Sequence, residues 1–279
     1  MLQLLCSTGT FSRFPDLTDY RSILTFGSEL EVDGFELMFY PDWSANLDHI
    51  SKALLASELK FPVIHAEKGI IPALLSSKTD EVEQGWQWMH KNCVLAELLG
   101  CSLLIFHLWG FPTYDVELER NLFYLKDCIK IAEDYRLKLA IETVPCKYND
   151  PLSNIHRVLD QEPDMLVALD TEFLAMHNQL EAAYQADWLW QRNRVRHIHI
   201  KDYDGSGYSS DTARRYLHPG EGSINFLEMF DILKLRQFSG NISLESSIVD
   251  QDGSRDISKL KQSLAWLRQL QLHYNTYTI

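Results

Sequence analysis

The sequence predicts an α/β fold of the TIM-barrel type, a (β/α)8 barrel, in one domain over residues 1–279. Eight short apolar segments alternate with eight longer segments that have helical spacing. No Pro-, Gly- or Ser-rich linker interrupts the alternation, and the 279 residues are 46% hydrophobic. This length and composition suit one large core surrounded by helices.

The short apolar segments are the predicted strands. They cover residues 3–6, 34–39, 63–66, 102–106, 139–143, 166–170, 197–201 and 242–245. In the seventh, within VRHIHIKDYDG, the ionisable residues His197, His199 and Lys201 fall on one face. Burying such side chains without partners is costly, so we expect this strand to end at a functional site.

The predicted helices follow the strands at residues 18–31, 45–59, 79–99, 116–136, 151–160, 177–191, 225–236 and 254–271. Asp150 and Pro151 form an N-terminal helix signal at the start of the fifth. An open doubly wound sheet is the alternative fold. No GxGxxG or GxxxxGK[ST] motif follows a predicted strand, which weakens that alternative.

Composition limits the partners. The formal net charge of −13 repels phosphate backbones and anionic lipid, so nucleic acid and membranes are not expected partners. Five scattered cysteines without a CxxC motif favour a reducing cytoplasm over a disulfide framework. The sequence shows no signal-peptide pattern and no apolar stretch long enough to cross a bilayer. We therefore expect a cytoplasmic protein that binds a small molecule.

Chemically active side chains stand at the predicted strand ends, which converge on one face of a TIM barrel. They are Glu36, His65, His107, Glu142, Asp170, His199, Lys201 and Glu245. Glu142, Asp170, His199 and Glu245 would repel one another as a bare cluster, and a divalent cation would cancel that repulsion. A set of oxygens with one nitrogen favours Mn²⁺ or Mg²⁺, with Co²⁺ and Zn²⁺ as further options.

Each of these residues has a structural alternative. A lone Glu at a strand end is more often a cap or a salt-bridge partner, and a lone strand His is more often a hydrogen-bonded core residue. Lys201 and Asp202 can pair with each other. A functional site is favoured because ionisable side chains occur together at the matching ends of successive predicted strands.

The motifs IETV, LDTEF, HIHIKDYDG, LHPGEGSINF and SLES lie within residues 141–246, at the predicted ends of the fifth to eighth strands and in the loop after the seventh. With them the sequence resembles the xylose-isomerase-like TIM-barrel superfamily, in its sugar phosphate isomerase and epimerase group. The resemblance implies a divalent metal held by Glu142, Asp170, His199 and Glu245. It also implies that Glu142 and Glu245 act as an acid/base pair on a metal-stabilised enediolate.

Further residues are predicted to contact substrate, namely Glu36, His65, His107, Trp109, Lys201, Arg214, Arg215 and His218. His65 and His107 match positions that bind extra zinc in the endonuclease-IV branch and contact sugar hydroxyls in other members. Trp109 is suited either to stacking on a sugar or to rim packing. Arg214, Arg215 and His218 precede Pro219 and are suited to a hydroxyl or phosphate.

Some positions depart from the family pattern. Phe173 stands where members often carry a His, and Tyr216 stands where endonuclease-type members carry an Asp. Phe173 argues against a trinuclear zinc site, and both departures argue against phosphodiester hydrolysis at abasic DNA. Thr143 follows the fifth-strand Glu where a polar residue such as Asn is common.

The resulting prediction is a metal-dependent isomerase or epimerase of a sugar or sugar phosphate. An inosose-type dehydratase, which is a lyase, is the enzymatic alternative on the same site. An abasic-site endonuclease is disfavoured by the acidic charge, and a non-catalytic sugar-binding barrel by the complete ligand set. Trp188 and Trp190 are expected either at an interface of a homo-oligomer or in the core between helices and barrel.

Overall fold

The computed structural model describes residues 1–279 except 13–16, 112, 207–215, 251 and 277–279. Its eight strands form a closed barrel in sequence order, which confirms the predicted α/β TIM-barrel class. They are Gln3–Ser7 (β1), Gly34–Met38 (β2), Val63–His65 (β3), Leu103–Phe106 (β4), Lys138–Glu142 (β5), Leu166–Asp170 (β6), Val195–Ile200 (β7) and Asn241–Leu244 (β8).

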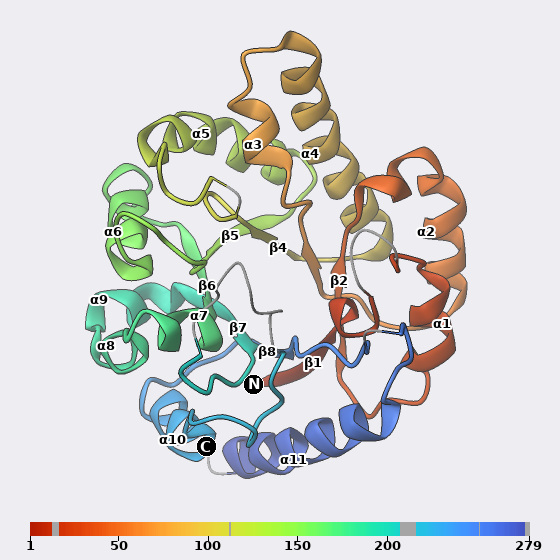
Figure 1. The fold of residues 1–279 in the computed structure, drawn as a ribbon, viewed down its shortest axis with the longest axis vertical. Coiled ribbons are helices and arrows are strands. Elements are labelled where there is room, and N and C mark those ends of the chain that lie inside the picture. The colour runs from red at the N-terminus through yellow and green to blue at the C-terminus, as the bar shows by residue number, and fades with distance from the viewer. Residues whose placement is uncertain (13–16, 112, 207–215, 251, 277–279) are drawn as a thin grey trace. The chain divides into compact units, whose positions relative to one another are not determined.

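Helices follow the strands along the chain (Figure 1). They are Arg21–Gly27 (α1), Leu47–Ala56 (α2), Ile70–Leu74 (α3), Thr79–Leu99 (α4), Leu118–Asp134 (α5), Pro151–Gln161 (α6), Thr171–Met176 (α7), Leu180–Gln185 (α8), Asp187–Trp190 (α9), Phe226–Leu235 (α10) and Ile257–Thr276 (α11). Short 3₁₀ turns cover Thr8–Phe11, Pro41–Ala45 and Gln191–Asn193.

The chain groups into two compact units. Unit 1 contains Met1–Asp33 and Ala168–Ile279, and unit 2 contains Gly34–Val167. Whether residues 1–279 behave as one domain therefore stays a prediction.

In unit 2, β2, β3, β4 and β5 pair side by side as parallel strands. Helices α2, α4, α5 and α6 lie on the outer side of these strands (Figure 1). On α5, Leu118, Leu122 and Leu125 are buried, as their helical spacing predicts. The Asp150 side chain accepts a hydrogen bond from the Ser153 N–H, which confirms the predicted start of α6.

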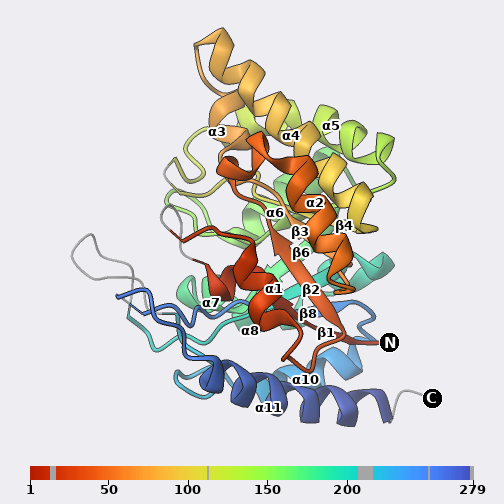
Figure 2. The same ribbon diagram turned by 90° about the vertical axis from the view of Figure 1, so that its right-hand side faces the viewer.

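In unit 1, β8 lies between β7 and β1, and all three strands are parallel. Figure 2 shows α10 beside the long helix α11. Leu260, Leu264 and Leu267 of α11 are buried, and their spacing of three and four residues places them on one face of the helix. Register places His199 opposite Ser243 near the carboxyl end of β8.

The single helix predicted over 177–191 is wrong. The structure has α7 directly after β6, and then the short helices α8 and α9. Two backbone features explain the breaks. Asn178 adopts a positive φ of 55°, and Ala186 is extended between α8 and α9. Asp170 begins α7 early because its carboxylate caps the Phe173 N–H.

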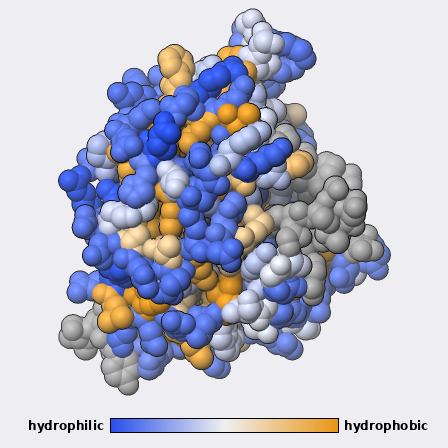
Figure 3. Space-filling view, turned by 60° about the vertical axis from the view of Figure 1, so that its left-hand side comes forward, coloured by the Kyte–Doolittle hydropathy of each residue, from blue (hydrophilic) through white to orange (hydrophobic). Residues whose placement is uncertain are grey.

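Hydrophilic side chains cover most of the face shown in Figure 3, with hydrophobic ones scattered among them. This distribution is typical of a protein surface in contact with water. Among the described residues, no helix combines the length and apolar character that crossing a membrane requires.

Candidate metal centre

The first cluster lies in unit 1, where three potential metal ligands come together. Asp170 ends β6, His199 lies near the end of β7, and Glu245 directly follows β8. His199 Nδ1 is 3.8 Å from Asp170 Oδ2 and 3.7 Å from Glu245 Oε2. One ligand atom from each residue lies within 4.8 Å of the others. Asp170 and His199 are fully buried, and the Glu245 side chain is 10% exposed.

The two oxygens of Asp170 serve different contacts. Oδ1 accepts a hydrogen bond of 2.9 Å from the Phe173 N–H at the start of α7. Oδ2 faces His199 and also contacts Lys201. Capping the helix fixes the carboxylate plane, so that Oδ2 is held toward the cluster.

Lys201 brings an ammonium group into the first cluster. Its Nζ lies 2.6 Å from Asp170 Oδ2, 2.6 Å from Glu245 Oε2 and 3.7 Å from Glu172 Oε2. The side chain is 3% exposed, and Nζ stands 4.4 Å from the centre of the Phe173 ring. The sequence left open a pair of Lys201 with Asp202, and in the structure the Asp202 carboxylate accepts hydrogen bonds from backbone N–H groups.

Thr171 fixes the end of β7. Its hydroxyl accepts from the Lys201 N–H at 3.0 Å and donates to the Lys201 carbonyl at 2.7 Å. The His199 carbonyl lies 3.1 Å from the same hydroxyl. This buried contact joins the residue after Asp170 to the backbone that carries His199 and Lys201.

The second cluster lies in unit 2 and centres on Glu142 at the end of β5. His65 Nε2 lies 3.1 Å from Glu142 Oε2, and His107 Nε2 lies 2.6 Å from the same oxygen. The two imidazole rings meet edge to face with centroids 4.9 Å apart. His65 and Glu142 are buried, and one ligand atom from each of the three residues lies within 4.8 Å of the others.

The protonation of His65 is informative. Its Nδ1 lies 2.9 Å from the Ala66 carbonyl, which can only accept, so Nδ1 carries the hydrogen. In the neutral ring, Nε2 then presents a lone pair to the Glu142 carboxylate. Two acceptors at 3.1 Å need a proton or a cation between them. Donation of the second ring N–H to a carbonyl is also typical of metal-binding histidines.

The proton affinity of His107 is lowered by its surroundings. Burial lowers the pKa of His107 to about 4, although the nearby Glu142 carboxylate acts in the opposite direction. His107 is therefore neutral near pH 7, and its imidazole can donate to Glu142 or bind a cation.

A buried carboxylate anchors the loops beside the second cluster. Asp115 accepts hydrogen bonds from the backbone N–H groups of Lys147, Tyr148 and Asn149 at 2.7, 3.1 and 2.8 Å. These residues follow β5, and Asp115 follows β4. Asp115 thus ties the loop after His107 to the loop after Glu142. Sequence reasoning missed it because nothing local marks an acid in a loop as an anchor.

A second buried carboxylate, Asp202, explains why His-x-Lys-Asp and Pro-Gly-Glu-Gly occur together. Its Oδ2 accepts from the Gly220 and Gly222 N–H groups, both at 2.9 Å. Its Oδ1 accepts from the Tyr203 and Ile224 N–H groups at 2.8 and 3.0 Å. A Cβ at Gly222 would come within 2.5 Å of Asp202 Oδ1, so the close approach requires glycine.

The other predicted substrate residues have varied surroundings. Trp109 is buried and donates from Nε1 to the Val144 carbonyl at 3.0 Å, as rim packing would place it. His218 is buried, with Nδ1 2.8 Å from Ser263 Oγ of α11. Glu36 is fully buried within β2. Arg214 and Arg215 lie outside the described residues. Substrate contact by these residues stays a prediction.

Glu172 is a member of the first cluster that sequence reasoning missed. It stands two residues after Asp170 in LDTEF, it is buried, and its carboxylate faces Lys201. The sequence did carry a signal for Glu172, because it is a second acidic residue close to the predicted ligand Asp170.

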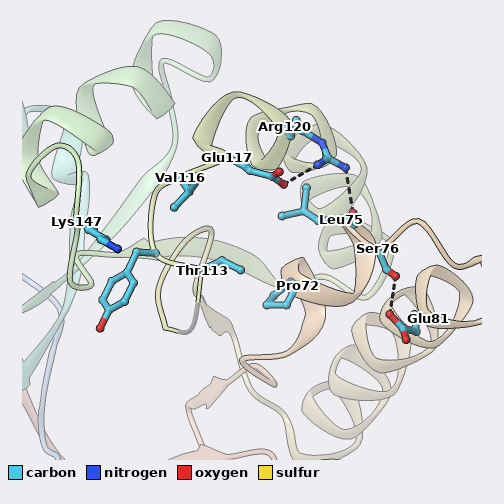
Figure 4. A pocket seen from close by; sticks show the side chains of 10 residues that line it. Pro72, Leu75, Ser76, Glu81, Thr113, Val116, Glu117, Arg120 and Lys147 are labelled. Atoms are coloured by element: carbon cyan, nitrogen blue, oxygen red, sulfur yellow. Dashed lines mark hydrogen bonds and ion pairs between the residues drawn. The ribbon is translucent and has the colours of Figure 1, made fainter. Parts of the chain in front are cut away.

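A surface pocket of about 450 Å³ in unit 2 contains none of the predicted site residues. Figure 4 shows Arg120 paired with Glu117 and with the Leu75 carbonyl, and Ser76 paired with Glu81. Lys147 lies on the opposite side of the pocket from Ser76. Because most of these charges pair with one another, the pocket offers no convergent ligand set comparable to the two clusters.

One curated relative, the uncharacterized protein MJ1311 of Methanocaldococcus jannaschii, is 29% identical over 163 residues, which is 54% of this chain. The chain spans about half the length of that relative, since the match covers 51% of it.

Solved structures show the same fold at low identity. A D-tagatose 3-epimerase-like protein has a TM-score of 0.73 and 19% identity, covering 99% of this chain and 100% of its own. A D-allulose 3-epimerase from Methylomonas sp. in complex with D-allulose has a TM-score of 0.68 and 18% identity, covering 96% of both chains. The IOLI protein with a bound zinc atom has a TM-score of 0.68 and 15% identity, covering 99% and 100%.

A family model described as xylose isomerase-like TIM barrel matches residues 24–270, which is most of the chain. The match includes both clusters and the buried acids that anchor their loops. The chain therefore belongs to the xylose isomerase-like TIM-barrel family.

Proposed function

We propose that the protein is a divalent-metal-dependent isomerase or epimerase of a sugar or sugar phosphate. The observation that carries this proposal is the convergence of Asp170, His199 and Glu245 in a buried cluster. Sugar epimerases among the structural neighbours support the reaction class.

The ligand atoms fit a metal ion. Metal–ligand bonds to oxygen and imidazole nitrogen are about 2.0–2.2 Å long, so two ligand atoms of one ion are at most about 4.4 Å apart. The separations of 3.8 and 3.7 Å from His199 Nδ1 to the two carboxylates lie within that limit. We assign Glu142 as the fourth ligand, because β5 precedes β6 in the barrel and parallel strands present their carboxyl ends at one face.

The donor set favours Mn²⁺ or Mg²⁺, since three carboxylates and one imidazole are mainly hard ligands. Co²⁺ and Zn²⁺ remain within the proposal, and a structural neighbour binds zinc. When bound, such a cation would polarise a ketose carbonyl and its neighbouring hydroxyl, and thereby acidify the adjacent C–H.

Glu142 and Glu245 are the proposed acid and base. One carboxylate removes the proton from the substrate carbon and the other returns a proton at the same or the neighbouring carbon. His65 and His107 both contact Glu142 Oε2 and so orient it. Lys201 orients Glu245 in a corresponding way. A carbohydrate is the proposed ligand, with His65, His107 and the loop before Pro219 as proposed contacts.

The test is solvent-deuterium exchange in the presence of Mn²⁺ against a panel of ketoses and ketose phosphates. We expect exchange in the wild type, and a loss of at least about 100-fold in Glu142→Gln and Glu245→Gln. Glu119→Gln, which changes an exposed glutamate on α5, is the matched control and should keep the wild-type rate.

Circular dichroism should show that both Gln variants keep the fold. If the assay instead detects loss of water from the substrate, the enzyme is a dehydratase that uses the same residues. Absence of both Mn²⁺ binding and exchange across the panel would exclude the proposed function.

A further inference from the structure

The first cluster contains a cation of its own. Lys201 Nζ is surrounded by the carboxylates of Asp170, Glu172 and Glu245, at 2.6, 3.7 and 2.6 Å. All of this lies in a nearly dry environment, where opposite charges interact more strongly than in water. The Phe173 ring, 4.4 Å from Nζ, covers the ammonium on one side and adds a favourable cation–π contact.

Among the described residues, Lys201 brings one positive charge to three carboxylates, those of Asp170, Glu172 and Glu245. A divalent cation beside His199 would add positive charge next to two of the same carboxylates. The lysine and a divalent ion could therefore both stabilise this acidic cluster.

The lysine and the proposed metal use the same two oxygens. Asp170 Oδ2 and Glu245 Oε2 are the atoms nearest to Lys201 Nζ and also the atoms that face His199 Nδ1. An ion bound beside His199 would share both oxygens with the ammonium. Lys201 must then draw electron density away from the ligands and repel the ion by its charge.

We propose that Lys201 is a positioning residue that acts as a built-in counter-cation of the metal centre. It holds Asp170 and Glu245 in the ligand geometry before metal arrives, and it weakens metal binding once the ion is present. Lys201 thus acts through the two carboxylates and not by contacting the sugar. This inference rests on the proposed function, because it takes the cation site beside His199 as given.

The test compares Lys201→Met, which keeps length and removes charge, with Lys201→Arg, which keeps charge. Mn²⁺ affinity is measured by electron paramagnetic resonance, and thermal unfolding is followed in EDTA and in excess Mn²⁺. Lys130→Met, at an exposed lysine on α5, is the matched control.

We expect Lys201→Met to unfold at a lower temperature than the wild type in EDTA, because the carboxylates lose their counter-ion. We expect it to bind Mn²⁺ about tenfold or more tightly and to gain more stability from Mn²⁺ than the wild type. Lys201→Arg and Lys130→Met should remain close to the wild type in both measurements.

Two outcomes would overturn the inference. One is weaker Mn²⁺ binding in Lys201→Met, and the other is an equal loss of thermal stability with and without Mn²⁺, which indicates a purely structural role. If Lys201→Met does not fold, the double variant with Glu172→Gln removes one charge of each sign. That double variant should bind Mn²⁺ more tightly than Glu172→Gln alone, and equal or weaker binding would likewise overturn the inference.

Failure of the proposed function gives a different result. A wild type that binds no Mn²⁺ contradicts the metal centre. Mn²⁺ binding by Lys201→Met under the same conditions would still show that the charge of Lys201 opposes binding of the ion. Absence of binding in both proteins would overturn both proposals.

Discussion

At the scale of single residues, the two clusters are organised by oxygens that serve more than one partner. Glu142 Oε2 contacts two imidazoles, and Asp170 divides its oxygens between a helix cap and the cluster. Such shared contacts fix side-chain rotamers, which is what a metal ligand needs before the ion arrives. The Thr171 hydroxyl likewise serves two partners, because it hydrogen-bonds both the N–H and the carbonyl of Lys201 just after β7.

Thr171→Val should destabilise the protein, because it keeps the side-chain volume and removes a buried hydroxyl. The Lys201 N–H and carbonyl would then lack their partner, at a cost of about 1–3 kcal/mol in the free energy of unfolding. Urea unfolding measures this cost. Thr171→Ser should recover most of it, and equal stability of Val and Ser variants would contradict the role of the hydroxyl.

At the scale of elements, buried carboxylates anchor the loops that follow the strands. Asp115 holds the segment after β5, and Asp202 holds the segment around Gly220 and Gly222. Each acid replaces the missing partners of several backbone N–H groups, which would otherwise be unsatisfied away from water. The loops near the two clusters are therefore fixed by side chains and not by regular secondary structure.

Asp115→Asn should lose stability in a pH-dependent way. Burial raises the pKa of Asp115, but the backbone N–H groups of Lys147, Asn149 and Tyr148 lower it more, so the net pKa lies below its ordinary 3.8. The stabilisation is present above pH 3.8 and is lost as pH falls through the native pKa. We expect the difference in free energy of unfolding between the wild type and Asp115→Asn, measured by urea unfolding, to decrease from pH 7 to pH 3. A constant difference would contradict this.

Gly222→Ala should be more destabilising than Gly220→Ala. A Cβ at Gly222 meets Asp202 Oδ1 and the Tyr203 carbonyl at 2.5 Å, whereas nothing lies within 4 Å of a Cβ at Gly220. Gly220→Ala carries only the strain of a positive φ, about 1 kcal/mol, and Gly222→Ala adds a steric clash with backbone. Thermal unfolding of the two variants compares them directly. If Gly220→Ala were the less stable variant, the loop around Gly222 would have to move and relieve the clash at little cost.

At the scale of the whole molecule, periodicity predicted the fold class because a βα repeat leaves a strong local signal. The strand 166–170 and the helix 79–99 agree with the structure to the residue. The helix predicted over 177–191 failed because its breaks depend on the backbone at Asn178 and Ala186, and neither residue type forces such a break.

The candidate site was only partly predictable. Strand-end residues such as Glu142 and Asp170 follow from the barrel pattern, because parallel strands end at one face. The division of contacts around Lys201, and the anchoring roles of Asp115 and Asp202, depend on partners far along the chain. One sequence carries no record of such long-range pairings.

The stability of the whole protein should fall as the solution is acidified from pH 7 to pH 5, in part through His218. Burial lowers the pKa of His218 to about 4, and the positive charge of Lys259 acts in the same direction, while Glu221 and Asp256 oppose it. Below the ordinary value of 6.5, the unfolded chain binds a proton that the native imidazole does not. This difference favours unfolding by about 2 kcal/mol at pH 5 relative to pH 7.

His218→Gln removes the titrating group and can keep a hydrogen bond to Ser263. We therefore expect urea unfolding of this variant to depend less steeply on pH between 7 and 5 than that of the wild type. His49→Gln, at an exposed position on α2, should keep the wild-type slope. Identical slopes for the wild type and His218→Gln would mean that native His218 takes up its proton as readily as the unfolded chain, so that its burial against α11 would not control acid stability.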